Sequence, residues 1–320
     1  MKAIQIQTNG DPDVMQLRDV PTPEPGEGQV RVKVEASGVN FIDIYKRSGQ
    51  YKVPLPFVLG EECAGVVDAV GAGVTEFKVG DRVAVAFTSG AYAEHVLASA
   101  DKLVALPDGA SSKQAAALML QGMTAHYLTH STFAVKPGDT VLIHAAAGGT
   151  GALAVQMAKL RGARVIGTTS TEAKSQVARE AGADEVFGYD NFDSEVKRVT
   201  GGKGVDVVYD SVGKDTFDRS LNCLRPRGML VLFGQASGAV PLFDLQILNA
   251  KGSLFITRPS LYAYILTRDE LLGRANDVLG WVASGKLTMR IDREFALKDA
   301  PEAHRALAGR GTTGKVLLIP

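Results

Sequence analysis

The chain has 320 residues with 35 basic and 35 acidic side chains, so its formal net charge is zero. A neutral chain has no electrostatic reason to bind nucleic acid or an anionic membrane surface, and we expect neither as a partner. An apolar fraction of 45% and a charged fraction of 22% are ordinary for a globular enzyme, and the length favours two domains.

The N-terminus and the cysteines limit the cellular setting. The first residues, MKAIQIQTNG, lack the apolar core of a signal peptide and are predicted to form a strand. No apolar run reaches the roughly 18 residues that a membrane span needs. The sequence contains two cysteines, Cys63 and Cys223, which lie far apart. This usage predicts no disulfide framework and favours a reducing compartment, so we expect a cytoplasmic protein.

The first part of the chain, up to about residue 110, consists of short apolar runs separated by glycine and proline turns. This spacing is typical of a small antiparallel, barrel-like unit. The predicted strands are Lys2–Ile6, Val30–Ala36, Gly65–Val70, Arg82–Ala86 and Ala93–Ala98.

From Ser111 onward, apolar runs alternate with helical stretches, which favours a doubly wound parallel sheet with helices on both faces. The predicted strands of this part are Thr140–His144, Arg164–Thr168, Glu185–Tyr189, Val205–Asp210, Gly228–Gly234 and Ser253–Thr257. After Pro259 the pattern changes again. The predicted elements there are a helix at Arg268–Ser284, a strand at Arg290–Ala296, a short helix at Ala300–Leu307 and a strand at Gly314–Ile319. We expect them to return to the first domain, giving domain limits of 1–118, 119–259 and 260–320.

A glycine-rich turn lies between the predicted strand Thr140–His144 and the helical pattern that runs to Lys159. In the motif G-x-G-x-x-G, Ala146 occupies the first glycine position, and Gly148 and Gly151 occupy the other two. A strand, a tight turn and a helix N-terminus together form a site for a pyrophosphate group. The sequence therefore predicts a dinucleotide-binding domain.

The end of the second predicted strand indicates which dinucleotide binds. NAD enzymes place an acidic residue about twenty residues beyond the glycines, but the segment Gly167–Thr171 ends without one. Small hydroxyl groups and the nearby Lys174 suit the 2′-phosphate of NADPH. The alternatives are that Lys174 is a solvated surface residue and that Glu172 only begins the next helix.

These motifs resemble the zinc-free NADPH:quinone oxidoreductases of the zeta-crystallin type, within the medium-chain dehydrogenase/reductase superfamily. The resemblance covers essentially the whole chain and implies a GroES-like β-barrel catalytic domain, a Rossmann domain and a homodimer. The signature falls on Gly138, Asp139, Leu142, Ala146, Ala147, Gly148, Gly149, Gly151, Gln156 and Lys159. Further matching segments are Gly38–Gly49, Gly71–Ala84, Gln121–Leu128 and Thr257–Leu261.

The residues that bind catalytic zinc in related alcohol dehydrogenases are absent from this sequence. Asn40 stands where those enzymes have a cysteine, and Glu61 stands where they have a histidine. No cysteine lies between Cys63 and Cys223 to provide a third ligand, and the cluster of structural cysteines is also missing. We therefore expect no metal, and both cysteines are predicted to be buried apolar side chains.

The resemblance implies hydride or electron transfer from NADPH to a quinone in the cleft between the domains. The protein would orient the reactants and donate hydrogen bonds to the developing oxyanion. The candidate catalytic residues are Asn40, Asp43, Tyr45 and Tyr51. In the family, residues matching Asn40 and Tyr45 contact the cofactor region, and Tyr51 matches a tyrosine proposed as proton donor in enoyl thioester reductases. Alternatively, Asn40 shapes a loop, Asp43 caps a helix, and the tyrosines pack as aromatic side chains.

Further cofactor contacts are expected from matching segments and from the carboxyl ends of strands, where an open α/β sheet binds its ligand. They are Gln121, Thr124, Ala147, Gly148, Gly149, Thr150, Gly151, Thr169, Ser170, Lys174, Tyr189, Phe233, Gly234, Gln235, Phe255 and Thr257. Arg258 is a candidate for substrate contact, with a surface ion pair as its alternative. His144 is predicted to fill space in a strand.

Two other functions remain open. An NADPH-dependent reductase of α,β-unsaturated carbonyls or enoyl thioesters would use the same residues, with a proton from Tyr51 or water. A non-catalytic NADPH-binding protein is the hypothesis from a different class.

Overall fold

The computed structural model describes residues 1–320, which form two compact units. Unit 1 comprises Met1–Met123 and Ile265–Pro320, and unit 2 comprises Thr124–Tyr264. The chain thus leaves unit 1 and returns to it. The units change at 123/124 and 264/265, where the sequence predicted domain limits at 118/119 and 259/260. None of the helices combines the length and the apolar character that crossing a bilayer requires.

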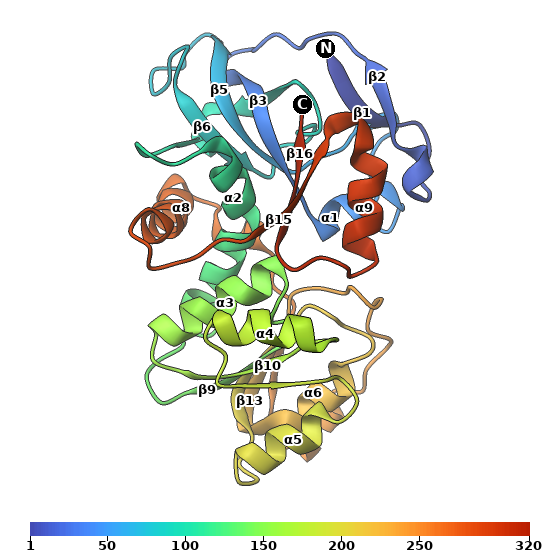
Figure 1. Cartoon of the computed structure of the whole chain (residues 1–320), viewed down its shortest axis with the longest axis vertical. Helices are drawn as coiled ribbons and strands as arrows, with labels where there is room; N and C mark the ends of the chain where they lie inside the picture. Colours follow the sequence, from blue (N-terminus) through green and yellow to red (C-terminus); the bar gives the residue numbers. More distant parts are fainter. The chain divides into compact units, whose positions relative to one another are not determined.

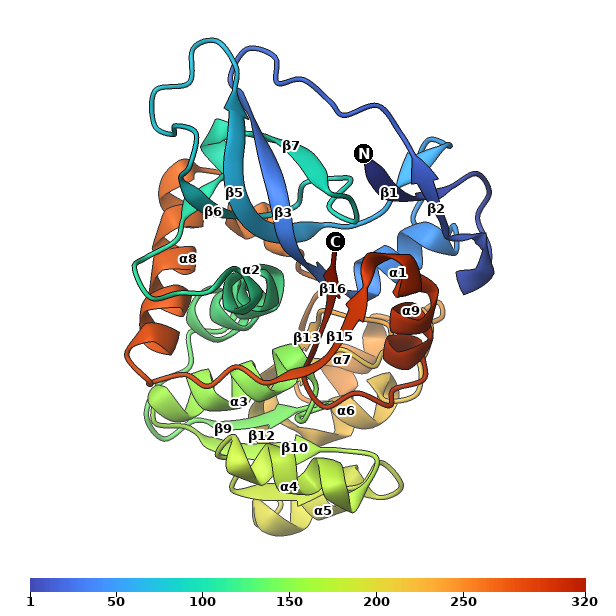
Figure 2. The same cartoon turned by 45° about the horizontal axis from the view of Figure 1, so that its top comes forward.

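Unit 1 is built from two sheets that are mostly antiparallel (Figures 1 and 2). The small sheet has the order β2 (Gln16–Asp19), β1 (Lys2–Ile6) and β4 (Phe57–Val58). The larger sheet has the order β15 (Ile291–Ala296), β16 (Lys315–Ile319), β3 (Gln29–Val39), β5 (Glu62–Val70), β6 (Arg82–Ala86) and β8 (Val104–Ala105), and β7 (His95–Ser99) also pairs with β3. Only β15 and β16 pair in parallel. The barrel-like antiparallel unit is therefore confirmed.

The helices of unit 1 come from both ends of the chain. They are α1 (Phe41–Arg47), α8 (Arg268–Ala283) and α9 (Ala300–Ala308), with short 3-10 turns at Pro12–Val14, Ala100–Lys102 and Leu297–Asp299. Figures 1 and 2 both show α9 beside α1. Apolar residues of α9 and β16 join those of β1 in one buried cluster, so the C-terminal segment completes the core of this unit.

Unit 2 contains a six-stranded parallel sheet with helices packed on it (Figure 1). Its order is β11 (Glu185–Phe187), β10 (Arg164–Thr168), β9 (Thr140–Ile143), β12 (Val205–Asp210), β13 (Leu224–Leu232) and β14 (Phe255–Thr257). Numbered along this unit, the order is 3-2-1-4-5-6, the arrangement of dinucleotide-binding sheets. The predicted doubly wound fold is confirmed. The central strands β9 and β12 are buried along almost their whole length, because both faces of a parallel sheet are covered.

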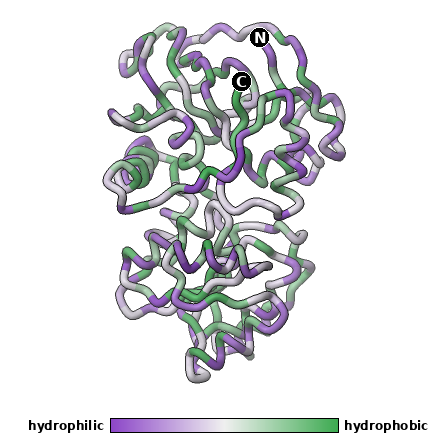
Figure 3. The backbone as a smooth tube through the Cα atoms, in the orientation of Figure 1, coloured by the Kyte–Doolittle hydropathy of each residue, from purple (hydrophilic) through white to green (hydrophobic).

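Several helices pack apolar side chains against this sheet. The helices are α3 (Gly149–Leu160), α4 (Glu172–Glu180), α5 (Phe192–Val199), α6 (Phe217–Cys223) and α7 (Gln246–Ala250), with a π turn at Leu128–Thr132 and a 3-10 turn at Leu261–Tyr264. Helix α2 (Ser112–Tyr127) contains the boundary between the units. Hydrophobic and hydrophilic residues alternate along α5 in Figure 3, as expected for a helix with one buried side, here formed by Phe192 and Val196.

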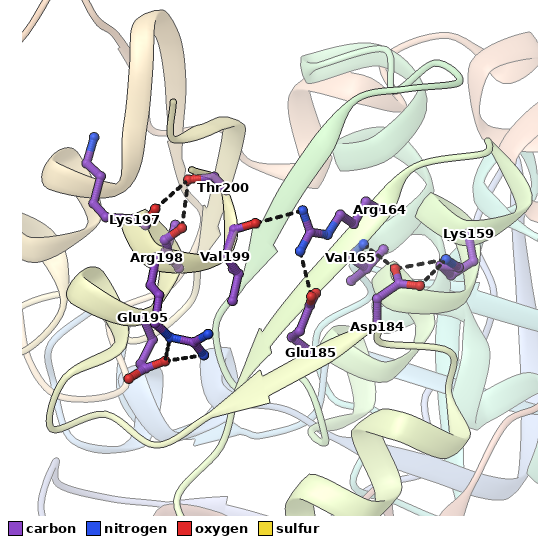
Figure 4. A network of polar contacts seen from close by, with 11 residues as sticks. Lys159, Arg164, Val165, Asp184, Glu185, Glu195, Lys197, Arg198, Val199 and Thr200 are labelled. Carbon is purple, nitrogen blue, oxygen red and sulfur yellow. Dashed lines mark hydrogen bonds and ion pairs between the residues drawn. The ribbon is translucent and has the colours of Figure 1, made fainter. Parts of the chain in front are cut away.

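The amino ends of the parallel strands carry a group of ion pairs, drawn in Figure 4. Lys159 pairs with Asp184 at 2.8 Å and Arg164 pairs with Glu185 at 2.6 Å. Arg164 also donates to the carbonyl oxygen of Val199 at 3.0 Å. A hollow of about 230 Å³ lies here, lined by Thr140, Arg164, Val199, Thr200, Lys203 and Gly204. It is at the opposite edge of the sheet from the glycine-rich turn, and these pairs belong to the fold rather than to the predicted site.

Candidate active site

The glycine-rich turn of unit 2 connects β9 to α3. Its tight bend is made by Ala145, which has a left-handed backbone with φ of +51°. The N–H of Gly148 donates to the carbonyl of Ala145 at 2.9 Å, and the N–H of Ala146 donates to that of Thr168 at 3.1 Å. The left-handed residue thus comes one position before Ala146, which occupies the first glycine position of the motif.

The helix packs directly onto this bend. A Cβ atom at Gly151 would lie 2.2 Å from the carbonyl oxygen of Ala145, so only glycine allows this approach. Gly148 caps α3 and provides no side-chain hydrogen bond to its first turn. The first backbone N–H groups of a helix have no intrahelical acceptor, and they favour an anion. The turn therefore fits a pyrophosphate group.

The end of β10 carries hydroxyl groups and no carboxylate. Thr169 is buried, and its hydroxyl contacts that of Ser175 at 2.7 Å, whereas Ser170 is exposed. Thr171 caps α4 by accepting from the N–H of Lys174, whose side chain is partly exposed. The next acid, Glu172, pairs with Arg179 at 2.6 Å in the same helix. This edge lacks the acidic ligand typical of NAD sites.

Other predicted contacts lie near the turn or at the carboxyl ends of strands. The hydroxyl of Tyr189 accepts a hydrogen bond from the N–H of Ala145 at 3.0 Å. Phe233, Gly234 and Gln235 directly follow β13, and Thr257 ends β14. The expectation that Phe255 lies at a carboxyl end is wrong, because β14 is short and Phe255 is its first residue, paired with Met229. Arg258 follows β14 and is exposed.

Two predicted residues lie on α2. Gln121 and Thr124 are each only 9% exposed. The Oε1 atom of Gln121 is buried and has no hydrogen-bond partner. A buried acceptor without a donor is unfavourable, and a bound ligand with an N–H or O–H group relieves it.

Unit 1 holds Asn40 in a buried ionic cluster. Lys315 and Glu62 form an ion pair in which both side chains are fully buried. The Oδ1 atom of Asn40 accepts from Lys315 Nζ at 2.8 Å, and its Nδ2 donates to Glu62 Oε1 at 2.7 Å. The backbone N–H of Leu120 donates to the other Glu62 oxygen at 2.6 Å. The amide of Asn40 is therefore held in one orientation, by a lysine that the sequence did not indicate.

Asp43 lies in the first turn of α1 and is fully buried. Its Oδ2 atom accepts from the N–H of Asn40 at 2.9 Å and from the hydroxyl of Tyr92 at 3.0 Å, whereas Oδ1 has no partner. Burial, together with the nearby carboxylate of Glu61, raises the pKa of Asp43 to about 8. The carboxyl thus supports the start of α1 and carries a proton at neutral pH.

The free energy of unfolding of the wild type is expected to fall as the pH rises, and Asp43→Asn is expected to remove the part of this fall that Asp43 causes. The folded protein keeps a proton on Asp43 up to about pH 8, whereas the unfolded chain releases it near its ordinary value of 3.8. Between these values, each pH unit lowers the free energy of unfolding by up to about 1.4 kcal/mol through this residue. Urea unfolding at about pH 6.5 and pH 7.5 should show a steeper loss for the wild type than for Asp43→Asn. Equal losses would show that Asp43 is ionised in the folded protein.

The two candidate tyrosines lie against each other. Tyr45 is 9% exposed and Tyr51 is 38% exposed, with ring centroids 5.3 Å apart. The backbone N–H of Tyr51 donates to the carbonyl of Tyr45 at 2.9 Å. Tyr45 therefore has the burial of a packing residue, and Tyr51 is the more accessible phenol.

The residues that stand where related alcohol dehydrogenases have zinc ligands make other interactions here. Glu61 is buried and pairs with Lys46, and Asn40 is held by Lys315. No group of three or more His, Cys, Asp or Glu side chains is placed to hold a metal ion. Cys63 and Cys223 are buried and unpaired, and burial raises the pKa of both thiols, to about 12 for Cys223.

Comparison with known proteins identifies the family. The family described as "Alcohol dehydrogenase GroES-like domain" matches residues 26–108, and that described as "Zinc-binding dehydrogenase" matches residues 149–270. The chain is 50% identical to a quinone oxidoreductase of Pseudomonas aeruginosa, over 100% of this chain and 99% of the relative. It is 46% identical to a 2-haloacrylate reductase of Burkholderia, over 99% and 98%.

A solved structure gives the same result. The crystal structure of Escherichia coli quinone oxidoreductase complexed with NADPH has 46% sequence identity to this chain, covers 100% of both chains and has a TM-score of 0.98. With its GroES-like unit, its dinucleotide-type sheet and these relatives, the chain belongs to the quinone oxidoreductase family of the medium-chain dehydrogenase/reductase superfamily.

Proposed function

We propose that this protein is an NADPH-dependent, metal-independent reductase of quinones. The observation that carries the proposal is the glycine-rich turn, which fits a pyrophosphate, in a chain that is similar over its full length to quinone oxidoreductases. A relative of almost the same fold was crystallised with NADPH, which supports this choice of cofactor.

The cofactor would be held by groups that fit its parts, most of them in unit 2. The N–H groups at the start of α3, from Gly149 to Gly151, would bind the pyrophosphate. The hydroxyl of Ser170 and the cation of Lys174 would face the 2′-phosphate, since no carboxylate there repels it. The unpartnered oxygen of Gln121 would accept from the nicotinamide amide.

When bound, NADPH supplies a hydride to an electron-poor acceptor. The chain's own residues would orient that acceptor and handle the accompanying proton. Asn40 has both amide atoms engaged, so we assign it to holding the junction of β3 and α1. Asp43 keeps a proton on its carboxyl at neutral pH, and Tyr51 offers an accessible hydroxyl. Quinones accept a hydride readily, so we expect no single side chain to be indispensable for them.

The direct test follows NADPH absorbance with purified protein in EDTA. Phenanthrenequinone, benzoquinone and an alkenal serve as parallel acceptors, and NADH is the control cofactor. Rapid, chelator-insensitive oxidation of NADPH by quinones supports the proposal. Equal rates with NADH would overturn the cofactor assignment. NADPH binding without turnover on any acceptor would indicate a non-catalytic binding protein.

The 2-haloacrylate reductase relative favours a second candidate, the reduction of α,β-unsaturated acids or carbonyls. In this reaction the hydride goes to the β-carbon and a proton goes to the α-carbon. Tyr51 is the accessible proton donor among the candidate residues.

Tyr51→Phe is therefore expected to reduce the turnover of 2-haloacrylate or an alkenal by about 100-fold, within the usual range for general acid catalysis. Quinone turnover should change by less than about threefold. Steady-state kcat and KM for both substrates measure this difference between the two reactions. An equal loss on both acceptors would assign Tyr51 to packing against Tyr45.

We also propose that the protein is a cytoplasmic homodimer that pairs through β14. This strand forms one edge of the parallel sheet, and Phe255 on it is 56% exposed. An unpaired strand edge favours pairing with a second copy. Light scattering should give twice the chain mass of 33.8 kDa. A mass of one chain at micromolar concentration would refute the dimer.

A further inference from the structure

His144 lies between β9 and the left-handed Ala145, and its side chain is fully buried. Its Nδ1 atom is 2.7 Å from the hydroxyl of Thr168, and its Nε2 atom is 2.8 Å from that of Ser220. The prediction that this residue only fills space in a strand is wrong. Both ring nitrogens have partners, on β10 and on α6.

The network continues to a buried carboxylate at the end of β12. The hydroxyl of Ser220 donates to Asp210 Oδ2 at 3.2 Å, and the hydroxyl of Thr216 donates to the same oxygen at 2.7 Å. The other oxygen, Oδ1, accepts from the N–H groups of Val212 and Gly213 at 2.8 and 3.0 Å. Asp210 therefore accepts four hydrogen bonds and donates none.

Because Asp210 only accepts, the donor and the acceptor of every hydrogen bond in this series can be assigned. Ser220 has a single hydrogen, which goes to Asp210, so its oxygen accepts from the Nε2–H group of His144. Burial lowers the pKa of His144, so the ring is neutral and carries only that one N–H. Its Nδ1 atom must then accept from the hydroxyl of Thr168. The order is Thr168 to His144 to Ser220 to Asp210.

This series of hydrogen bonds holds the bend of the glycine-rich turn from both sides. Thr168 binds the side chain of His144 through its hydroxyl and the N–H of Ala146 through its carbonyl. The residue between them, Ala145, has a backbone conformation that alanine rarely adopts. Its carbonyl is the surface on which Gly151 packs. The side chain of His144 is therefore connected through Thr168 and the bend to the first turn of α3.

We propose that His144 is a positioning residue of the dinucleotide site, which holds Ala145 in its left-handed conformation through Thr168 and anchors it to Asp210 through Ser220. The inference rests on the proposed NADPH binding by unit 2. It assigns to four buried polar side chains a role in cofactor affinity, without contact with the cofactor.

Four variants test the inference, each measured for NADPH affinity by fluorescence titration and for stability by urea unfolding. Thr168→Val removes the hydroxyl that His144 accepts, and His144→Leu removes both bonds of the ring. His144→Asn keeps a polar atom near the position of Nδ1. Tyr209→Phe is the matched control, because it removes another buried hydroxyl of unit 2, which donates to the carbonyl of Leu128 at 3.1 Å.

Thr168→Val and His144→Leu should raise the Kd for NADPH by at least about tenfold, the effect of roughly one buried hydrogen bond. His144→Asn should recover most of the affinity, and Tyr209→Phe should stay within about twofold of the wild type at a similar loss of stability. If His144→Leu does not fold, Thr168→Val decides. Unchanged affinity in Thr168→Val, or no recovery of affinity in His144→Asn, overturns this inference and leaves the proposed function standing. A wild-type protein that does not bind NADPH overturns the proposed function as well.

Discussion

Lys315→Met is expected to lower the free energy of unfolding by about 3–5 kcal/mol, because it leaves the carboxylate of Glu62 buried without its cation. Both side chains of this pair are fully buried, and Asn40 bonds to each of them. The substitution keeps the length and the apolar part of the lysine, so the lost charge dominates the effect. Urea unfolding at neutral pH measures the change.

Lys159→Met is the matched control for this prediction. Lys159 pairs with Asp184 at 2.8 Å, but these side chains are 36% and 38% exposed. Water replaces a lost partner at such a site, so we expect a change below about 1 kcal/mol. Similar losses of unfolding free energy in the two variants would show that water or another group compensates the Glu62 carboxylate when Lys315 is absent.

Gly151→Ala is expected to weaken NADPH binding by at least about 100-fold, which corresponds to about 2.7 kcal/mol. The new Cβ would lie 2.2 Å from the carbonyl oxygen of Ala145. That atom belongs to the backbone of the bend, so either the bend or the start of α3 has to move. Both changes misplace the N–H groups that would bind the pyrophosphate, and titration with NADPH measures the loss.

Gly273→Ala provides the control for this glycine. Gly273 lies within α8 in unit 1, and a Cβ there would meet no atom within 4 Å. Alanine also favours a helix over glycine by about 1 kcal/mol. We expect unchanged affinity and slightly higher stability. NADPH binding by Gly151→Ala at the level of Gly273→Ala would show that the contact relaxes without moving the turn.

The fold could be predicted from the sequence because its signals are local. Strands β1, β6, β10 and β12 have the bounds that the apolar runs predicted, and the alternation of strand and helix predicted the parallel sheet. The glycines predict the turn. They do not predict its left-handed residue, because Ala145 carries no sequence signal for that conformation and is held there by bonds to its neighbours.

The contents of the candidate site could be predicted only in part. The replacement of zinc ligands by Asn40 and Glu61 was evident from residue type. Their partners were not, because Lys315 meets Asn40 only through the pairing of β16 with β3, and sequence periodicity does not report such pairing. The partners of His144 are hidden from the sequence for a similar reason, since Thr168 on β10 and Ser220 on α6 are close to it only in the folded unit.

The discontinuous course of unit 1 has a consequence for synthesis on the ribosome. Unit 2 is one continuous segment and can fold as soon as Tyr264 has emerged. Strand β3 has to wait for β16, since Val39 pairs with Val316. At about 5–20 residues per second this delay is roughly 15 to 55 s. The ion pair of Glu62 with Lys315 cannot form before that interval ends, so it is among the last contacts of folding. Truncations near the C-terminus should therefore yield a folded unit 2 attached to an incomplete unit 1, which limited proteolysis of the nascent chain can detect.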